Sequence, residues 1–491
     1  MVTIAYIALT VYCIALGYIM FYCMLQFHLL YYYQKHEHPE LVDLETEGNN
    51  TVPYVTIQLP IFNELYVTER LIDHIVKLDY PKDRLQIQVL DDSTDETVEI
   101  SRKKVAEYVT KGFDIELMTR VDRSGYKAGA LKAAMPNVKG EFIAIFDADF
   151  LPRTDFLRKT IPHFNEPNIG VVQTRWEHIN QDYSLITRLQ AMQLNVHFRV
   201  EQTGRSTGNC LLQFNGTAGV WRKKTIEDAG GWEADTLTED LDLSYRAQLK
   251  GWKITFLEEI GSPSELPAEM NGLKSQQFRW MKGGAENARK LIPAVLRSDL
   301  SFRQKIHSVG HLLASTVYLF IFLAGVFSVP LLFSLQTLGL NTQYFAIFLT
   351  SLASIIAIYY VANVQAEPSN KSVAYETVKF IFIFPVFLAL SMGLSLHNSI
   401  AVIQGYWGKE SPFVRTPKFN INNIKDSFKK QNYLATRLSW TTIFEGLLAL
   451  YFIGAVIAGI QMGDYTFMLF HVMLVIGYGS IFYYTVKHLR A

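Results

Sequence analysis

Cysteine is scarce in this sequence, and neither sign of charge is in excess. Of the 491 residues only three are cysteine; Cys13 and Cys23 stand in a stretch without charge, and Cys210 stands alone. This spacing predicts neither a disulfide framework nor a structural zinc site. Lys and Arg together number 46, as do Asp and Glu, so the net charge gives no reason to expect nucleic acid as a partner.

Formal charge is also missing from several long stretches. None occurs in Met1–Gln34, which is longer than the apolar part of a signal peptide and lacks a basic start, so it predicts a retained transmembrane helix. None occurs in Gly310–Gln365, which is long enough for two spans joined by the turn Gln336–Gln343. Two further spans fit Trp440–Gln461 and Tyr465–Val486.

Between the first span and the later ones, polar and apolar residues alternate in short blocks, as in a soluble domain with one large α/β core. The predicted organisation therefore has five parts. They are a transmembrane helix (1–34), a cytosolic domain (35–306), two transmembrane helices (307–365), an interfacial helix with a loop (366–439), and two transmembrane helices with a short tail (440–491).

The loops between the spans predict the orientation in the membrane. Gln336–Gln343 and Met462–Tyr465 contain no Lys or Arg, whereas Arg297–Lys305, Lys409–Arg437 and Lys487–Arg490 are basic. Because basic loops stay on the cytosolic side, the large domain is expected in the cytosol. The chain is then a multi-pass protein of a plasma or inner membrane, and the lipid bilayer is a partner.

One apolar segment does not follow this alternation. Phe380–Gly408 carries no formal charge, but Lys379 precedes it and Lys409 follows it, so both ends look cytosolic. It also contains polar residues such as His397, which favours an interfacial or re-entrant helix. An ordinary sixth span remains the alternative.

Two predicted strands of the domain end in carboxylates. The β-rich run Leu85–Leu90 leads into Asp91 and Asp92, and Phe142–Phe146 leads into Asp147-Ala148-Asp149. The carboxyl ends of strands in open α/β sheets are where nucleotides bind. Two carboxylates two residues apart can hold Mg²⁺ or Mn²⁺ on a diphosphate, since hard cations prefer oxygen ligands.

Later motifs carry further groups suited to a phosphorylated substrate. They are Arg123–Leu131 with Lys127, the glycine-containing turn Phe214–Gly219, Thr238-Glu239-Asp240, and Gln276–Trp280. Each also has a structural explanation, since Lys127 could be a solvated residue at a helix start and Asp240 a helix cap.

In this order, the motifs resemble those of the inverting glycosyltransferases of family 2. Their signature is an acidic nucleotide loop, an Asp-x-Asp, a Thr-Glu-Asp and a Gln-x-x-Arg-Trp, and the resemblance covers Val52–Trp280. The residues of Phe214–Trp221 and Gly230–Trp232 are similar to those of the cellulose-synthase-like A and C branch. That branch is associated with the synthesis of β-mannan and xyloglucan backbones. The resemblance implies an α/β GT-A domain, Rossmann-like and binding a nucleotide sugar, with an α-helical transmembrane region.

The same resemblance implies roles for individual residues. Asp240 would be the general base, with Glu239 beside it, and Arg279 would stabilise the leaving diphosphate. Asp147 and Asp149 would hold Mg²⁺ or Mn²⁺. The substrate-binding residues would be Asp91 or Asp92, Glu64, Lys127, Asn215, Gln276 and Trp280, with Trp280 under the acceptor sugar.

A further similarity lies beyond the domain. Phe413–Lys418 resembles the Phe-x-Val-Thr-x-Lys gating loop of cellulose synthases, with Arg415 in the place of Val, and would bring Thr416 and Lys418 to the diphosphate. The alternative is a basic loop attracted to anionic lipid. Trp176 and Trp407 are candidates for additional sugar-stacking positions.

The resulting expectation is a processive enzyme that makes a β-linked hexose polymer from a UDP- or GDP-sugar and exports it. Its partners would be the nucleotide sugar, the growing glycan and the bilayer; homo-oligomerisation stays open. A single-transfer enzyme acting on ceramide or a polyprenyl phosphate is the alternative. A nucleotide-sugar receptor without catalysis is a third hypothesis, against which the presence of both Asp240 and Arg279 argues.

Overall fold

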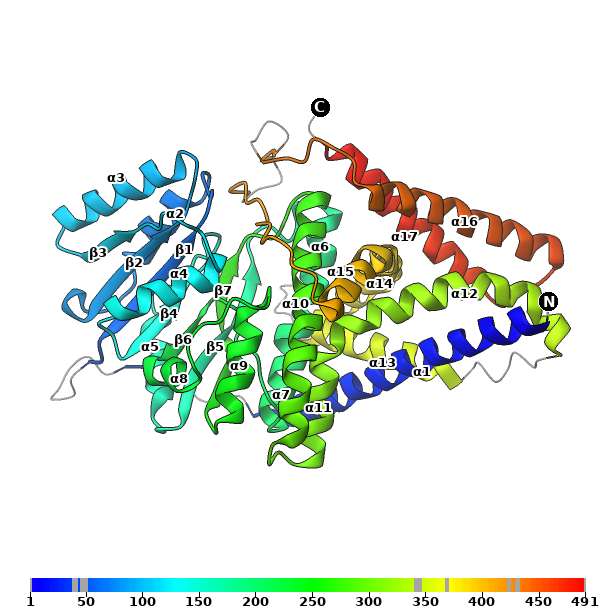
Figure 1. Cartoon of the computed structure of the whole chain (residues 1–491), viewed down its shortest axis with the longest axis horizontal. Helices are drawn as coiled ribbons and strands as arrows, with labels where there is room; N and C mark the ends of the chain where they lie inside the picture. Colours follow the sequence, from blue (N-terminus) through cyan, green and yellow to red (C-terminus); the bar gives the residue numbers. More distant parts are fainter. Residues whose placement is uncertain are drawn as a thin grey trace.

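The computed structural model describes residues 2–37, 43–44, 52–339, 347–366, 371–421, 425–428 and 433–489. A sheet domain lies at one end of the molecule and a bundle of long helices extends from it (Figure 1). The predicted division into a mixed α/β domain and a helical region is confirmed.

The domain is built on a seven-stranded sheet with the order β3-β2-β1-β4-β6-β5-β7. Only β6 runs antiparallel to its neighbours. The predicted strands are present within one or two residues at each end. The bounds are β1 Val55–Ile61, β2 Leu85–Asp91, β3 Asp114–Met118, β4 Phe142–Ile145, β5 Ile169–His178, β6 Gly219–Arg222 and β7 Lys253–Ser264.

Helices cover both faces of this sheet, so its central strands are buried except at Pro60. One core joins Ile57 and Phe146 to Leu71, and the other joins Ile143 and Trp221 to residues such as Leu131. The helices of the domain are α2 Thr68–Ile75, α3 Thr97–Thr110, α4 Tyr126–Ala134, α5 Phe156–Thr160, α8 Lys223–Asp228 and α9 Glu239–Leu249, with 3-10 turns η1 Lys82–Arg84, η2 Met135–Asn137 and η3 Ile161–Phe164.

The remaining helices form the junction with the bundle and the bundle itself. At the junction are α6 Leu185–Asn195, the π-helix η4 Val196–Glu201, α7 Gln202–Thr207, α10 Met270–Arg297, α11 Phe302–Leu312 and the 3-10 turn η5 Ala314–Thr316. The bundle contains α1 Val2–Tyr33, α12 Val317–Leu338, α13 Leu349–Tyr360, the π-helix η7 Val361–Gln365, α14 Val373–Gly393, α15 Ser395–Trp407, α16 Trp440–Met462 and α17 Met468–Lys487.

Five helices in the described ranges are long and apolar enough to cross a membrane, by length and composition. They are α1, α12 with its preceding turn, α14, α16 and α17. The chain is therefore a membrane protein, and the predicted spans at 1–34, 440–461 and 465–486 match helices. The second span predicted within 310–365 is a shorter apolar helix, Thr350–Gln365. Residues 340–343 of the turn predicted before it lie outside the described residues.

Loops with and without Lys or Arg lie at opposite ends of the helical bundle. The start of α1, the far end of α12 and the turn between α16 and α17 lie away from the sheet domain, whereas the C-terminal end of α17 lies toward it (Figure 1). The turn without Lys or Arg is thus remote from the domain, and the basic C-terminal segment is close to it.

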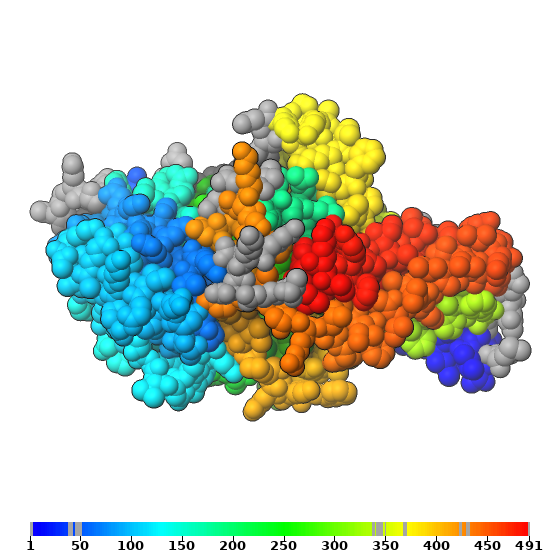
Figure 2. Space-filling model, turned by 90° about the horizontal axis from the view of Figure 1, so that it is seen from above, coloured from blue at the N-terminus to red at the C-terminus, as the bar shows by residue number. Residues whose placement is uncertain are grey.

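The segment predicted as one interfacial helix, Phe380–Gly408, differs from the prediction in its bounds. Leu394 interrupts it, so that α14 begins seven residues earlier at Val373 and α15 follows as a separate helix. In Figure 1 both are seen nearly end-on while α1, α12, α16 and α17 extend lengthwise. In Figure 2 the yellow beginning of this region and the gold α15 emerge on opposite sides of the molecule. Both views place α14 and α15 across the long helices, next to the domain.

A buried ion pair joins the domain to the bundle. Lys274 Nζ on α10 lies 2.8 Å from Glu445 Oε2 on α16, and the two side chains are 6% and 0% exposed. The carbonyl of Lys274 also accepts a hydrogen bond from His397 Nε2 on α15, at 2.9 Å. Three segments far apart in the sequence therefore meet at the start of α10.

Candidate active site

The Asp-x-Asp pair follows the end of β4, and each carboxylate contacts a lysine. Lys127 Nζ lies 2.5 Å from Asp147 Oδ1 and also donates to the carbonyl of Gly216, at 3.0 Å. Burial opposes the charge on Lys127, but Asp147 and Glu239 outweigh it and raise the Lys127 pKa. Lys127 is therefore a fixed cation, not a solvated residue at a helix start.

The donor set at this pair fits a divalent ion shared with a diphosphate. Lys418 Nζ contacts Asp149 Oδ2 at 2.5 Å, so the lysines engage one oxygen of each carboxylate. No third Asp, Glu, His or Cys of the described ranges gathers with this pair closely enough to complete a protein-only site. Two carboxylates alone suit an ion that takes its other ligands from phosphate and water.

The two carboxylates of the acidic loop after β2 lie in different surroundings. Asp91 is 1% exposed and accepts hydrogen bonds from Ser93 N–H and the Ser101 hydroxyl. It braces its own loop and does not line the cavity. Asp92 does line it, held by Arg120, whose Nε lies 3.0 Å from Asp92 Oδ1. Of the two candidates for the nucleoside, Asp92 is therefore the one whose position favours contact with a bound ligand.

Asp240 stands in the first turn of α9, where its carboxylate faces the cavity. Its Oδ1 accepts from Leu241 N–H at 2.9 Å, and a Cβ on Gly216 would lie 3.0 Å from its Oδ2. Burial, and next the charge of Glu239, raise the pKa of Asp240 to about 7. A carboxylate with such a pKa can accept a proton near neutral pH, as a general base requires.

The start of α9 is tied to α10, which carries the predicted Gln276, Arg279 and Trp280. Asn287 Nδ2 donates to the hydroxyl of Thr238 at 2.8 Å and to its carbonyl at 3.1 Å. These bonds fix the helix that holds the base relative to the helix that holds the guanidinium.

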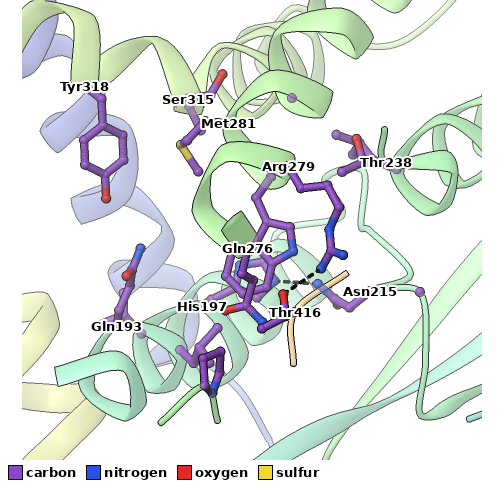
Figure 3. A pocket seen from close by; sticks show the side chains of 18 of the residues that line it. Gln193, His197, Asn215, Thr238, Gln276, Arg279, Met281, Ser315, Tyr318 and Thr416 are labelled. Carbon is purple, nitrogen blue, oxygen red and sulfur yellow. Dashed lines mark hydrogen bonds between the residues drawn. The ribbon is translucent and has the colours of Figure 1, made fainter. Parts of the chain in front are cut away.

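The gating-like loop lies over Arg279. Arg279 Nη1 is 3.3 Å from the carbonyl of Val414 and Nη2 is 3.5 Å from Thr416 Oγ1. The guanidinium also stands 4.4 Å from the centre of the Phe413 ring. Figure 3 shows Arg279 and Thr416 pointing toward one another, with Asn215 beside them. The loop therefore touches the residue expected to hold the leaving group.

Two further loop cations contact acidic groups of the domain. Lys418 Nζ, besides Asp149, contacts the carbonyl of Glu265. Arg415 Nη1 lies 3.1 Å from Glu64 Oε2, and burial raises the Glu64 pKa to about 8, although Arg415 opposes this. Arg415, where cellulose synthases have Val, thus gives the loop an additional polar contact.

Every predicted catalytic, metal-binding and substrate-binding residue except Asp91 lines one cavity of about 910 Å³. Trp176 also lines it, and the centre of its ring lies 4.8 Å from that of the Phe198 ring. Trp407 does not line it; this residue is 81% exposed at the end of α15. The same cavity continues between α1, α12, α13, α14 and α17, where its lining includes Ile19, Tyr22, Tyr318, Ile321, Leu352, Tyr359, Phe387 and Phe470.

Sequence reasoning missed the contribution of α6 and η4 to this cavity. Gln193, His197 and Glu201 line it at intervals of four residues, which places them on one face of the continuous helical segment. The signal is weak, because a polar stripe on a helix is usually a solvated surface. Only the tertiary structure turns it toward the site.

Residues 53–283 match a family model described as glycosyltransferase like family 2. The matched segment contains the sheet with its strand-end carboxylates, the Thr-Glu-Asp and the Gln-x-x-Arg-Trp. The match agrees with the resemblance to family 2 glycosyltransferases, and the mixed sheet has the expected GT-A-like fold.

Within that class, the chain is similar to plant mannan synthases. It is 43% identical over 273 residues to glucomannan 4-beta-mannosyltransferase 2 of Arabidopsis thaliana, covering 54% of this chain and 51% of that protein. It is 44% identical over 268 residues to glucomannan 4-beta-mannosyltransferase 1 of Oryza sativa subsp. japonica, covering 53% and 51%. The chain thus matches about half the length of these curated relatives.

A solved structure has a similar fold. The mannosyltransferase PcManGT from Pyrobaculum calidifontis, in complex with GDP-Man and Mn²⁺, aligns with a TM-score of 0.54 at 18% identity, over 83% of this chain and 100% of that one.

Proposed function

We propose that the protein is an inverting, processive glycosyltransferase that polymerises a β-linked hexose, of the β-mannan or β-glucan type, from a nucleotide-diphosphate sugar and moves the product across the membrane. The observation that carries the proposal is the single cavity that runs from Asp147 and Asp240 to the helices α1, α12 and α17. Similarity to the glucomannan mannosyltransferases supports a mannan-type product.

The chemistry follows from the placement of the charged groups. Asp240 takes the proton of the acceptor hydroxyl, whose oxygen attacks the anomeric carbon of the donor as the bond to the diphosphate breaks. Attack from the side opposite the leaving group inverts the anomeric centre. Arg279 and Lys127 place cations where the leaving diphosphate gathers negative charge. Trp280 offers its ring face to the acceptor sugar.

Asp147 and Asp149 are the residues that would hold Mg²⁺ or Mn²⁺. Such an ion, when bound, neutralises charge on the diphosphate. The related fold solved with GDP-Man and Mn²⁺ supports this assignment. Since Lys418 contacts Asp149 in the structure, the lysine and the ion would share this carboxylate.

The catalytic domain would lie on the cytosolic side of a plasma or inner membrane. The basic C-terminal segment lies near the domain, and the turn between α16 and α17, without Lys or Arg, lies at the other end of the bundle (Figure 1). The crosswise direction of α14 and α15 supports their placement at the membrane interface.

Sealed vesicles with the domain outward test the proposal. A panel of UDP- and GDP-sugars first identifies the donor from which nucleotide is released. With that donor radiolabelled, long product is expected to accumulate inside and to resist an added glycan hydrolase. Absence of nucleotide release from every donor would contradict enzymatic function and favour a receptor.

A second candidate function is a single transfer to a lipid acceptor such as ceramide or a polyprenyl phosphate. It is favoured by the aliphatic side chains in the membrane half of the cavity, among them Ile19, Ile321 and Leu352. Product size on a gel separates the two, because a lipid enzyme yields a short, solvent-extractable product that the external hydrolase digests fully.

A further inference from the structure

A chain of four polar side chains leads from α7 to the cavity and back to η4. Gln202 Nε2 donates to Asn215 Oδ1 at 2.8 Å. Asn215 Nδ2 lies 2.8 Å from His197 Nε2. His197 Nδ1 lies 2.9 Å from Glu201 Oε2. Figure 3 shows His197 and Asn215 side by side in the pocket.

The direction of every bond in this chain is set at its two ends. Gln202 Nε2 also lies 2.7 Å from the carbonyl of Gln213, which can only accept, so this atom of Gln202 must be the amide nitrogen. Asn215 then accepts through its oxygen and presents its nitrogen to His197. The Nε2 of His197 must be the acceptor, so its proton resides on Nδ1 and is donated to Glu201.

This arrangement leaves one hydrogen-bond donor of Asn215 unused at the cavity. Asn215 Nδ2 has two hydrogens; one is used by His197, and the second has no partner among the described residues. Asn215 lines the cavity and precedes Gly216, which approaches the carboxylate of Asp240. The second N–H of Asn215 is therefore available to a group bound in the cavity that the proposed base, Asp240, also lines.

We propose that His197, held by Glu201, is a positioning residue that orients Asn215 to donate a hydrogen bond to the acceptor sugar. The inference rests on the proposed glycosyl transfer and assigns the recognition of a hydroxyl or ring oxygen of a glycan to this chain. The carboxylate of Glu201 at one end and the carbonyl of Gln213 at the other allow one orientation of the Asn215 amide. Hydrogen bonds that follow one another in such a chain strengthen each other. A hydrocarbon acceptor would leave the donor unsatisfied.

The test uses the full-length protein in detergent, the donor selected by the panel, and a short β-linked hexose oligosaccharide as acceptor. Glu201→Leu and His197→Ala are expected to raise the KM for acceptor by about tenfold, the cost of one misplaced hydrogen bond. Nucleotide release without acceptor and the Kd for nucleoside diphosphate with Mn²⁺ should stay as in the wild type. Glu201→Gln is expected to recover most of the loss, because the amide oxygen can still accept from Nδ1–H.

Two further variants keep the result interpretable. Asn215→Asp retains an acceptor for Gln202 but removes the donor, so it should raise the acceptor KM without lowering the melting temperature. Arg188→Ala on the outer face of α6 is the matched control. An unchanged acceptor KM in Glu201→Leu and Asn215→Asp, or a parallel change in nucleotide affinity, would overturn the inference. A wild type that transfers no sugar would instead contradict the proposed function.

Discussion

At the scale of single residues, the proposed base and the proposed leaving-group cation come from different helices. Asp240 belongs to α9 and Arg279 to α10, and Asn287 fixes the two helices to one another. The following predictions separate the base from its surroundings.

Asp240→Asn should reduce sugar transfer by about 10²–10⁴-fold, the usual contribution of a general base. Binding of nucleoside diphosphate should remain, since Asp147, Asp149 and Lys127 are unchanged. Single-turnover transfer and calorimetric Kd values measure the two effects. Turnover at the wild-type rate would exclude Asp240 as the base.

The pH dependence of kcat/KM should show the ionisation of Asp240. The base acts only when deprotonated, so activity is expected to rise with pH and to level off above about 7, where burial and Glu239 place the pKa. Glu239→Gln removes the second cause, so the rising limb should move to lower pH. A limb that stays in place in this variant would assign it to another group.

The sequence identified most of these residues because their chemistry is local: a carboxylate after a buried strand is recognisable without tertiary structure. Asp91 and Asp92 could not be told apart in this way, because neighbouring residues on a loop point in different directions. His197 and Glu201 were missed, because their role depends on which face of α6 and η4 is covered by the domain.

At the scale of elements, the loop of Phe413–Lys418 is the part of the site that connects the domain to the bundle. It touches Arg279, Asp149 and Glu64 through Thr416, Lys418 and Arg415. A loop with these contacts can close the site and release it after each transfer.

Replacing both Thr416 and Lys418 by Ala should lower polymer formation by about 10²-fold, comparable to the loss of a donor to a leaving group. The domain should stay folded, because the sheet and its two cores are untouched, but with a lower melting temperature, because Asp149 loses its lysine partner. Val414→Ala, in the same loop but with only its backbone carbonyl on Arg279, is the control. Full activity of the double variant would contradict a role of the loop in the reaction. It would favour the alternative, a basic loop attracted to anionic lipid.

The position of α14 and α15 can be tested by labelling. In a background without the three native cysteines, single cysteines at Ser372 and Ser411 should react with an impermeant reagent from the cytosolic side only, if the segment does not cross. Reaction of one of them from the outside would show that α14 spans the bilayer. Hydropathy does not decide whether α14 crosses the bilayer, since this helix is apolar enough to do so. The argument against a crossing comes from the placement of charges alone.

At the scale of the whole molecule, the sequence predicted a domain and a set of spans but not that they enclose one cavity. That continuity arises from side chains of elements far apart in the sequence, among them α1, α10 and α17. The same holds for the ion pair of Lys274 and Glu445, which are separated by most of the helical region.

Glu445→Leu should destabilise the protein by about 3–5 kcal/mol, since it leaves the Lys274 ammonium buried without its partner. The combined change Lys274→Met with Glu445→Leu should restore most of the stability. Thermal unfolding in detergent, followed by tryptophan fluorescence, gives both values. Equal destabilisation by the single and double changes would show that packing, rather than the pair, holds α10 to α16.

This pair also has a consequence for biogenesis. A lone carboxylate makes the insertion of a helix into lipid unfavourable, yet Glu445 lies in the second turn of α16, which begins at Trp440. Lys274 is synthesised 171 residues earlier, within a domain that can fold while the rest of the chain is still being made. The folded domain can therefore offer the ammonium as α16 leaves the translocon, and a domain that has failed to fold would leave α16 poorly retained. Integration of the last two helices would then act as a quality check on the catalytic domain.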